Sequence, residues 1–437
     1  MPFITPDAAQ KLTADLLQKK KAPDVQVTIA YRRSAVSRFA NNAITQNTQV
    51  EATNIRIDCS FEGRSGAAST TSLAPEALED ALRRAETLAR VAPPDPEYLP
   101  ALGPQKYLKP PGYFQQTAQL RAEERAKRVL TITEKAAKVQ VRASGTVESG
   151  ENVIVLANAQ GLFGYDASSS ALIGTTMTAS DSSGWARDTA SDIQLLDPAL
   201  LADRALEQTR LGAAPKDLPA GKYTVILAPA AVSQLVWFLY FLMDGRSTLD
   251  GVTFLSGGKL GQKLLPETIT LRSDPMNARV PGAQFGGDGL PQRPVHWIDK
   301  GVFQEVRWDR YTAQKNNRTP TPFPANLILE GDETKSIADL IQSTERGIFV
   351  THAWYVRYIK PSETLLTGLT RDGTFLIQDG KFAGGVKNLR FNESVLGMLE
   401  RTVASTKPVT AVDNEAPPGL FPALKIRDFN FVSATQF

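Results

Sequence analysis

The sequence predicts an α+β fold with an antiparallel sheet in an N-terminal domain and a β-rich C-terminal domain with few helices. Three observations lead to this prediction. Amphipathic helical patterns alternate with period-two hydrophobic runs in the first half. The composition changes near residues 215–221, and beyond that point short apolar runs are separated by glycine and proline turns. We therefore expect domains over 1–215 and 216–437, with a proline-rich connection at 92–115 inside the first.

The N-terminal segment predicts one helix, four strands and a second helix. Thr5-Pro6-Asp7 marks a helix start with proline at the first helical position, and this helix is expected to end near Lys20. A turn at Asn41-Asn42 separates the strands. Pro75 opens the second helix, which has an apolar face. The four strands are expected at 25–31, 36–40, 51–61 and 65–71.

The remaining elements follow from the same patterns. In the first domain we expect a charged helix at 117–137, strands at 139–147 and 153–157, a serine- and threonine-rich strand pair reaching Ser180, and a helix at 195–211. In the second domain we expect helices at 230–243, 334–345 and 391–403 and a hairpin at 375–381.

One apolar segment, Tyr223 to Met243, resembles a membrane span in hydropathy. Pro229 divides it, and the part that follows is shorter than the ~20 residues a bilayer requires. We interpret it as a buried strand followed by a buried helix.

Composition excludes several classes of protein. The net charge of +3 is spread along the chain, so no basic patch indicates nucleic-acid binding. The amino terminus lacks a basic region followed by an apolar one, so we expect no secretory signal and a cytoplasmic location. The single cysteine, Cys59, cannot form an internal disulfide, and its alternating neighbours predict a buried strand residue.

Metal-ligating residues are scarce. The chain has two histidines, His296 and His352, and one cysteine, and no two of the three are close in sequence. Zinc prefers imidazole nitrogen and thiolate sulfur, often with two ligands on one short element. We therefore expect no metal cofactor, and any histidine-dependent catalytic triad would have to use one of only two residues.

Two segments contain candidate binding residues. The run 348–357 is an aromatic-rich strand, in which period-two alternation places His352, Trp354 and Val356 on one face. Such a strand suits peptide binding, although a hydrogen-bonded structural histidine gives the same pattern. Asp288, between two glycines, is a candidate carboxylate in a loop, and the alternative is a turn aspartate that binds its own backbone.

Five segments in order resemble the TldD/PmbA family, also called the modulator-of-gyrase family of metallopeptidases. They are 37–44, 254–262, 285–291, 311–314 and 324–327. The resemblance implies two kinds of subunit. The TldD kind carries His-Glu-x-x-x-His on a helix and a distant cysteine, and binds zinc. The TldE, or PmbA, kind lacks these residues and pairs with the first.

This chain is similar to the TldE kind. The helix expected at 230–243 contains no histidine or acidic residue, and its polar residues include Ser233 and Gln234. No cysteine lies near the carboxyl end. The loop at 285–291 also departs from the family pattern, with Gly286-Gly287-Asp288 in place of the usual acidic pair. No catalytic or metal-binding residue of the family can therefore be carried over.

The leading hypothesis is a non-catalytic subunit of a two-component zinc peptidase that degrades or processes unfolded peptides. Its partner would be a TldD-like zinc subunit, or a second copy when the chain is alone. We expect peptide contacts at His352, Trp354, Asp288 and Gln234, through main-chain pairing at a sheet edge. The alternative is a stand-alone peptide-binding protein without hydrolytic activity. A third hypothesis is a metal-independent hydrolase that uses Asp288 or His352.

Overall fold

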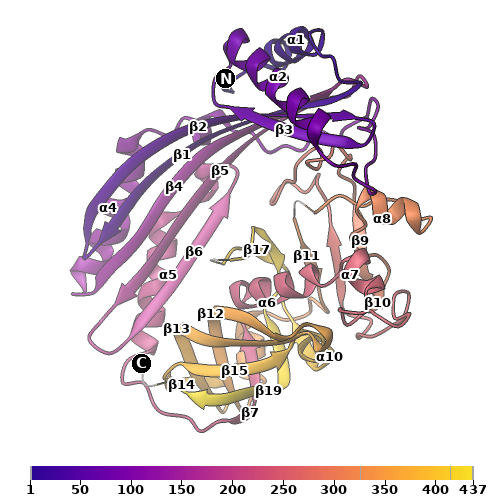
Figure 1. Ribbon diagram of the computed structural model, residues 1–437. Coiled ribbons are helices and arrows are strands. Elements are labelled where there is room, and N and C mark those ends of the chain that lie inside the picture. Colours follow the sequence, from indigo (N-terminus) through magenta and orange to yellow (C-terminus); the bar gives the residue numbers. More distant parts are fainter. Residues whose placement is uncertain (1, 325, 414, 436–437) are drawn as a thin grey trace.

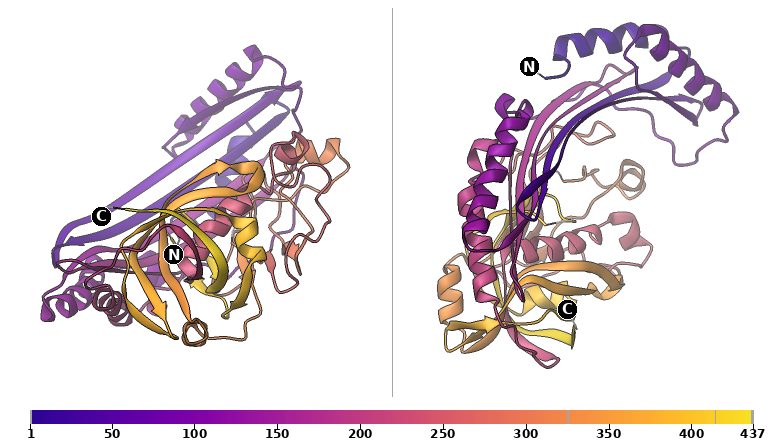
Figure 2. Two further views of the ribbon diagram at one scale, coloured as in Figure 1. Left: turned by 90° about the horizontal axis from the view of Figure 1, so that it is seen from below. Right: turned by 90° about the vertical axis from the view of Figure 1, so that its left-hand side faces the viewer.

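One long antiparallel sheet dominates the N-terminal half. The structure is a computed structural model that describes residues 2–324, 326–413 and 415–435. The strands lie in the order β3-β2-β1-β4-β5-β6, and Figures 1 and 2 show that they form a curved arch. Their bounds are β1 (Asp24–Ala40), β2 (Ala43–Phe61), β3 (Arg64–Thr70), β4 (Arg142–Asn158), β5 (Phe163–Thr178) and β6 (Ser183–Ala190).

Helices cover one face of this arch. They are α1 (Pro6–Leu17), α2 (Pro75–Val91), α3 (Gln115–Ala118), α4 (Ala122–Lys138) and α5 (Pro198–Leu211). One apolar cluster lies under α1 and α2 and includes Ile57 and Cys59. A second lies under α4 and α5 and includes Val129 and Ile173. The prediction that Cys59 is a buried strand residue is confirmed, and burial raises the pKa of its thiol to about 12.

The strands are longer than the sequence predicts. The breaks expected at 32–35 and at 148–152 do not exist, because β1 and β4 run through them without interruption. Arg33 and Glu151 lie directly opposite each other in these polar stretches and form an ion pair at 3.1 Å. Cross-strand pairing of opposite charges therefore keeps the backbone extended where hydrophobic alternation fails.

The C-terminal half contains two further sheets. One has the order β10-β9-β8-β11-β18-β17; the other has the order β12-β7-β19-β15-β13-β14, and β12 also pairs with β13, which closes a ring of strands. The strands are β7 (Gly221–Leu227), β8 (Thr270–Ser273), β9 (Val295–Asp299), β10 (Val302–Phe303), β11 (Ile328–Glu330), β12 (Arg346–Lys360), β13 (Leu365–Gln378), β14 (Lys381–Gly385), β15 (Leu389–Ser394), β16 (Thr402–Ser405), β17 (Val409–Ala411), β18 (Gly419–Phe421) and β19 (Leu424–Ala434).

Short helices complete this half: α6 (Pro229–Phe241), α7 (Gly245–Leu249), α8 (Arg310–Lys315), α9 (Ile337–Gln342) and α10 (Val395–Glu400). The strand and helix expected across Tyr223 to Met243 are present as β7 and α6. The sequence did not predict α7 and α8, which are too short to show a helical period. Part of the helix expected at 391–403 is strand, since β15 and β16 flank α10.

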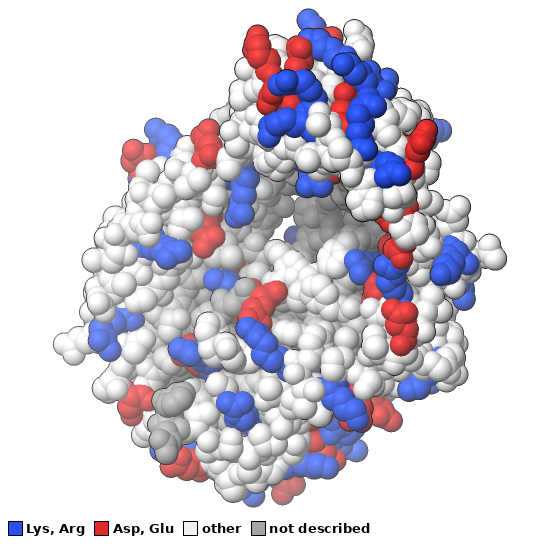
Figure 3. Space-filling model, in the orientation of Figure 1, with Lys and Arg blue, Asp and Glu red and all other residues white. Residues whose placement is uncertain are grey.

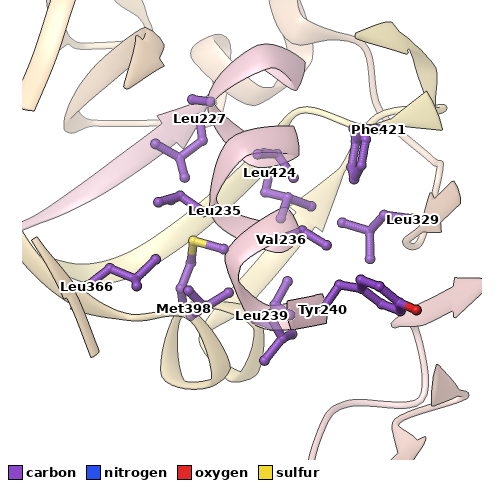
Figure 4. Packing of buried hydrophobic residues seen from close by; sticks show 14 of the residues in the cluster. Leu227, Leu235, Val236, Leu239, Tyr240, Leu329, Leu366, Met398, Phe421 and Leu424 are labelled. Atoms are coloured by element: carbon purple, nitrogen blue, oxygen red, sulfur yellow. The ribbon is translucent and has the colours of Figure 1, made fainter. Parts of the chain in front are cut away.

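The largest core cluster surrounds α6. Its side chains pack with residues from both C-terminal sheets, and Figure 4 shows Leu235 and Leu239 on the side of Leu366 and Met398 and Val236 on the side of Leu329. This all-round burial explains the continuous hydrophobicity of the helix. The predicted α+β class, with an antiparallel N-terminal sheet and a β-rich C-terminal part, is confirmed. None of the helices within the described ranges is long and apolar enough to cross a membrane.

A glycine controls how closely α2 approaches the sheet. A Cβ atom on Gly66 of β3 would lie 2.2 Å from the Ala89 amide nitrogen and 2.6 Å from the Ala85 carbonyl oxygen. We expect Gly66→Ala to lower the free energy of unfolding by about 1–3 kcal/mol, because the helix must shift away from the strand. Urea denaturation measures this change. The control is Gly103→Ala, which meets no atom within 4 Å; equal effects in the two variants would contradict this account.

Candidate functional site

The two polar side chains in the middle of α6 are fully buried. Ser233 is 0% exposed and donates a hydrogen bond to the Ala230 carbonyl at 2.8 Å. Gln234 is 1% exposed, and its amide nitrogen donates to the Ala353 carbonyl at 2.8 Å and to Asp413 Oδ1 at 3.1 Å. The reverse amide orientation would make one long bond, to Glu415 at 3.4 Å, so the first orientation is favoured.

His352 lies at the centre of a buried polar cluster. It belongs to β12 and is 1% exposed. Its Nδ1 is 3.8 Å from Asp413 Oδ2, and its Nε2 is 3.8 Å from Asp372 Oδ2. The imidazole stacks on the indole of Trp185 in β6, with 4.2 Å between ring centroids. The cluster therefore connects the last strand of the N-terminal sheet to the C-terminal half.

Asp372 strengthens this connection. Its Oδ1 accepts a hydrogen bond of 2.6 Å from the hydroxyl of Ser183, at the start of β6. Burial raises the pKa of the Asp372 carboxyl, but the His352 imidazole and the Ser183 hydroxyl lower it by more, so its pKa lies below the ordinary value. Asp372 is therefore ionised at neutral pH.

A cavity of about 240 Å³ lies beside the cluster. Its walls come from the inner faces of β4, β5 and β6 and from β12 and β13. The larger lining side chains are Trp185, Arg187, His352, Trp354, Arg371 and Asp372. The guanidinium carbon of Arg371 lies 4.8 Å from the ring centre of Trp354, and Arg371 Nε lies 3.4 Å from Asp372 Oδ2. The cavity thus combines two tryptophans, two arginines and one carboxylate.

The strand that carries His352 does not keep its alternation. Tyr355 has φ = 55°, and the pairing register shifts between Trp354 and Arg357. The prediction that His352, Trp354 and Val356 share one face is therefore wrong for Val356. Val356 packs in the main core together with Ala353, whereas Trp354 faces the cavity. The bulge re-aims the side chains that follow it.

The structure brings three of the four expected peptide-binding residues together. His352 and Trp354 line the same cavity, and Gln234 joins His352 through their shared neighbour Asp413. Asp288 lies in a separate loop, where its Oδ1 accepts a 3.2 Å hydrogen bond from the Leu290 amide. This is the turn arrangement that was its alternative interpretation.

Sequence reasoning missed Trp185, Asp372 and Asp413. Asp372 lies between an arginine and a glycine and reads as a turn residue, and Trp185 lies in a serine-rich stretch. The local signal was weak for all three residues, because their roles arise from contacts between distant segments.

The donor groups at this site do not converge on one point. Each ring nitrogen of His352 faces a different carboxylate, so only one of them could reach a given ion. Within the ranges that the structure describes, no group of three or more His, Cys, Asp or Glu side chains is arranged to hold a metal ion.

The lowered pKa of Asp372 predicts a pH-dependent contribution to stability. The folded state favours the ionised carboxyl, so the contribution is complete above ~3.9, the pKa in an unfolded chain, and disappears as the pH falls through the lower folded value. We expect Asp372→Asn to reduce the free energy of unfolding at pH 7 by roughly 1.5–3 kcal/mol, and we expect this difference to shrink as the pH falls below ~3.9. Denaturant titrations between pH 2.5 and 7 measure this difference. Ser183→Ala should show a smaller effect of the same sign, and a difference that does not vary with pH would contradict the assignment.

Comparison with known proteins agrees with this architecture. Models of the PmbA/TldA metallopeptidase central domain and C-terminal domain match residues 116–212 and 220–433. Metalloprotease PmbA from Escherichia coli O157:H7 is 24% identical over 267 residues, covering 58% of this chain and 59% of that protein. The chain therefore matches about three fifths of that relative's length.

Solved structures share the fold over almost the whole chain. TldE from Thermococcus kodakarensis has a TM-score of 0.84 at 18% identity, covering 98% of this chain and 100% of that one. A protein from Thermotoga maritima described as a candidate modulator of a DNA gyrase has a TM-score of 0.85 at 20% identity, covering 97% and 100%. Since the two domain models together match well over half of the sequence, this chain belongs to the PmbA/TldD family of metallopeptidase-like proteins.

Proposed function

We propose that this chain is the non-catalytic, TldE-like subunit of a two-component zinc peptidase that acts on unfolded peptides. A TldD-like subunit would supply the zinc and the hydrolytic step. This chain would supply walls of the peptide chamber and contacts to the peptide. A cytoplasmic location, without nucleic-acid or membrane partners, is part of the same proposal.

The chemistry of α6 carries the proposal. In the zinc-binding kind of subunit, two histidines one turn apart on this helix would grip the metal. Here the buried polar groups are the neutral side chains of Ser233 and Gln234, and both are already hydrogen-bonded to protein atoms. The adjacent histidine, His352, directs its nitrogens toward separate carboxylates. These residues do not fit a catalytic zinc, so we assign no reaction step to a metal on this chain.

A free strand edge supports a partner subunit. Strand β3 pairs with β2 only between Ile55 and Phe61, and no described strand pairs with the outer edge of β2 between Ala43 and Asn54. Almost all side chains of this stretch are exposed, and Glu51 is its one charged residue. Proteins usually protect long edges with charges, prolines or bulges, because an open edge pairs with other chains. We assign this edge to the zinc-bearing homologue.

The inner surface of the arch supports passage of a peptide. Its residues on β1 and β5 are mostly polar, for example Arg32, Ser34, Ser168 and Ser170, and the helices cover the opposite face. Figure 3 shows a hollow between this arch and the C-terminal half. A polar wall can solvate the backbone of an unfolded peptide without selecting its sequence.

Peptide contact at the cavity belongs to the same proposal. We place the peptide against Trp354, with the buried side chains of His352 and Gln234 holding the cluster in position from behind. Asp288 stays a prediction, since its carboxylate already accepts a hydrogen bond from its own loop.

The proposal predicts activation on mixing. The purified chain and its zinc-bearing homologue should elute as one complex, and hydrolysis of an unstructured peptide should increase at least tenfold over the homologue alone. Full activity of the homologue alone, with no complex, would exclude the subunit role. Peptide binding by this chain in that case would favour the stand-alone binding protein.

A charge on the free edge tests the contact surface. We expect Val50→Lys, on the exposed stretch of β2, to weaken the complex at least tenfold, because a lysine at a strand edge opposes further pairing. Analytical ultracentrifugation measures the affinity. Ala14→Lys, at an exposed position of α1, is the matched control and should leave it unchanged. Equal weakening by both variants would show that net charge, and not the edge, is responsible.

A further inference from the structure

The cavity beside His352 is large enough to hold one group of a larger ligand. Its volume of about 240 Å³ greatly exceeds the roughly 10–15 Å³ that one water molecule needs. The floor is the polar inner face of the arch, including Ser144, Thr146 and Thr176, and the C-terminal half forms the opposite wall. A ligand in the cavity would therefore contact both halves of the chain.

The charged groups that line this cavity favour an anion. Arg187 and Arg371 contribute two positive charges and Asp372 one negative charge. The carboxylate of Asp372 accepts the 2.6 Å hydrogen bond from Ser183 and lies 3.4 Å from Arg371 Nε, so it offsets one of the two positive charges and leaves a net charge of one. The excess of positive charge faces a partly open space bounded by two indole rings, where water screens charges less than at an open surface.

The arginines are held in orientations that suit a planar ligand. The guanidinium of Arg371 lies over the ring of Trp354, which fixes its plane while half of its side chain stays exposed. Arg187 lies across Gly174, its cross-strand neighbour on β5. A Cβ atom on Gly174 would lie 3.3 Å from Arg187 Nε, so the glycine leaves room for the arginine against the sheet. A stacked guanidinium presents its N–H edge, which matches the two oxygens of a carboxylate.

We propose that this cavity is a subsite for a carboxylate group of the bound peptide, held by Arg371 with Arg187 beside it, while the neighbouring peptide unit lies on Trp354. The inference rests on the proposed function, because it assumes that a peptide occupies the hollow. Two groups could supply the carboxylate: the carboxyl terminus of the peptide, or an acidic side chain within it.

Four peptides of one neutral, unstructured sequence separate these sources. The first ends in a free carboxylate, the second in an amide, the third is the amide with one internal glutamate, and the fourth has glutamine in place of that glutamate. Isothermal titration calorimetry with the full chain measures each affinity. A charge-assisted hydrogen bond contributes about 1.5–3 kcal/mol, so we expect one carboxylate-bearing peptide to bind about 10–100-fold more tightly than its neutral counterpart.

Two arginine variants make the test specific. Arg371→Gln should reduce the affinity of the preferred peptide to that of its neutral counterpart and leave the neutral peptide unchanged. Arg357→Gln is the matched control, since Arg357 is on the same strand as Trp354, is exposed to the same 49%, and also lies over an aromatic ring, that of Tyr355. It should preserve the preference.

The outcomes distinguish the subsite from the proposed function. Equal binding of acidic and neutral peptides, binding of none of them, or equal weakening by both arginine variants would overturn the subsite. Activation of the zinc-bearing homologue is measured separately. Activation without discrimination between the peptides would leave the subunit role intact and remove the subsite. Discrimination that depends on Arg371, without activation, would keep the subsite and remove the subunit role.

Discussion

The contact between β6 and the strand pair β12–β13 joins the N-terminal sheet to the C-terminal half beside the cavity. The indole of Trp185 covers the imidazole of His352, and Ser183 donates a hydrogen bond to Asp372. Burying a histidine between two carboxylates is costly unless each group has compensating neighbours. The cluster therefore accepts few rearrangements. Because its members also line the cavity, the relative position of the arch and the C-terminal half sets the shape of the proposed peptide site.

The rest of the architecture follows from how the faces of the long sheet are used. One face is covered by helices and carries the two N-terminal core clusters. The other faces the hollow, and its polar residues Arg32, Ser34, Ser168 and Ser170 are exposed or half-buried. A fully buried sheet would need apolar residues on both sides. The serine- and threonine-rich character of β5 therefore reflects its position along an open interior, and the ion pair of Arg33 with Glu151 keeps the neighbouring strands extended.

Local features of the fold were readable from the sequence. The strand-plus-helix interpretation of Tyr223 to Met243 is confirmed, and the Asn41-Asn42 turn has both residues at positive φ, as its chemistry indicates. The predictions that were wrong concern features that depend on contacts with distant segments of the chain. Two strands were predicted where β1 is one, because its polar middle is stabilised by β4. The sequence predicted that the alternation of β12 continues past Tyr355. The structure has a bulge there, and a bulge produces no periodic pattern that would reveal it in the sequence.

The candidate site shows the same division between local and distant signals. His352, Trp354 and Gln234 stand out by residue type within recognisable elements. Asp372 acquires its role from Ser183, 189 positions earlier in the chain, and no periodicity records such a contact. Asp288 was singled out by its flanking glycines, which are explained by the turn alone.

The exposed edge of β2 between Ala43 and Asn54 also affects how readily the protein aggregates when it is produced. Under the proposed function, a chain synthesised in excess of its partner would keep a long, weakly charged strand edge open, and such an edge can pair with further copies and aggregate. Matched production of the two proposed subunits, or rapid proteolytic removal of the surplus, would then keep unpaired chains from precipitating.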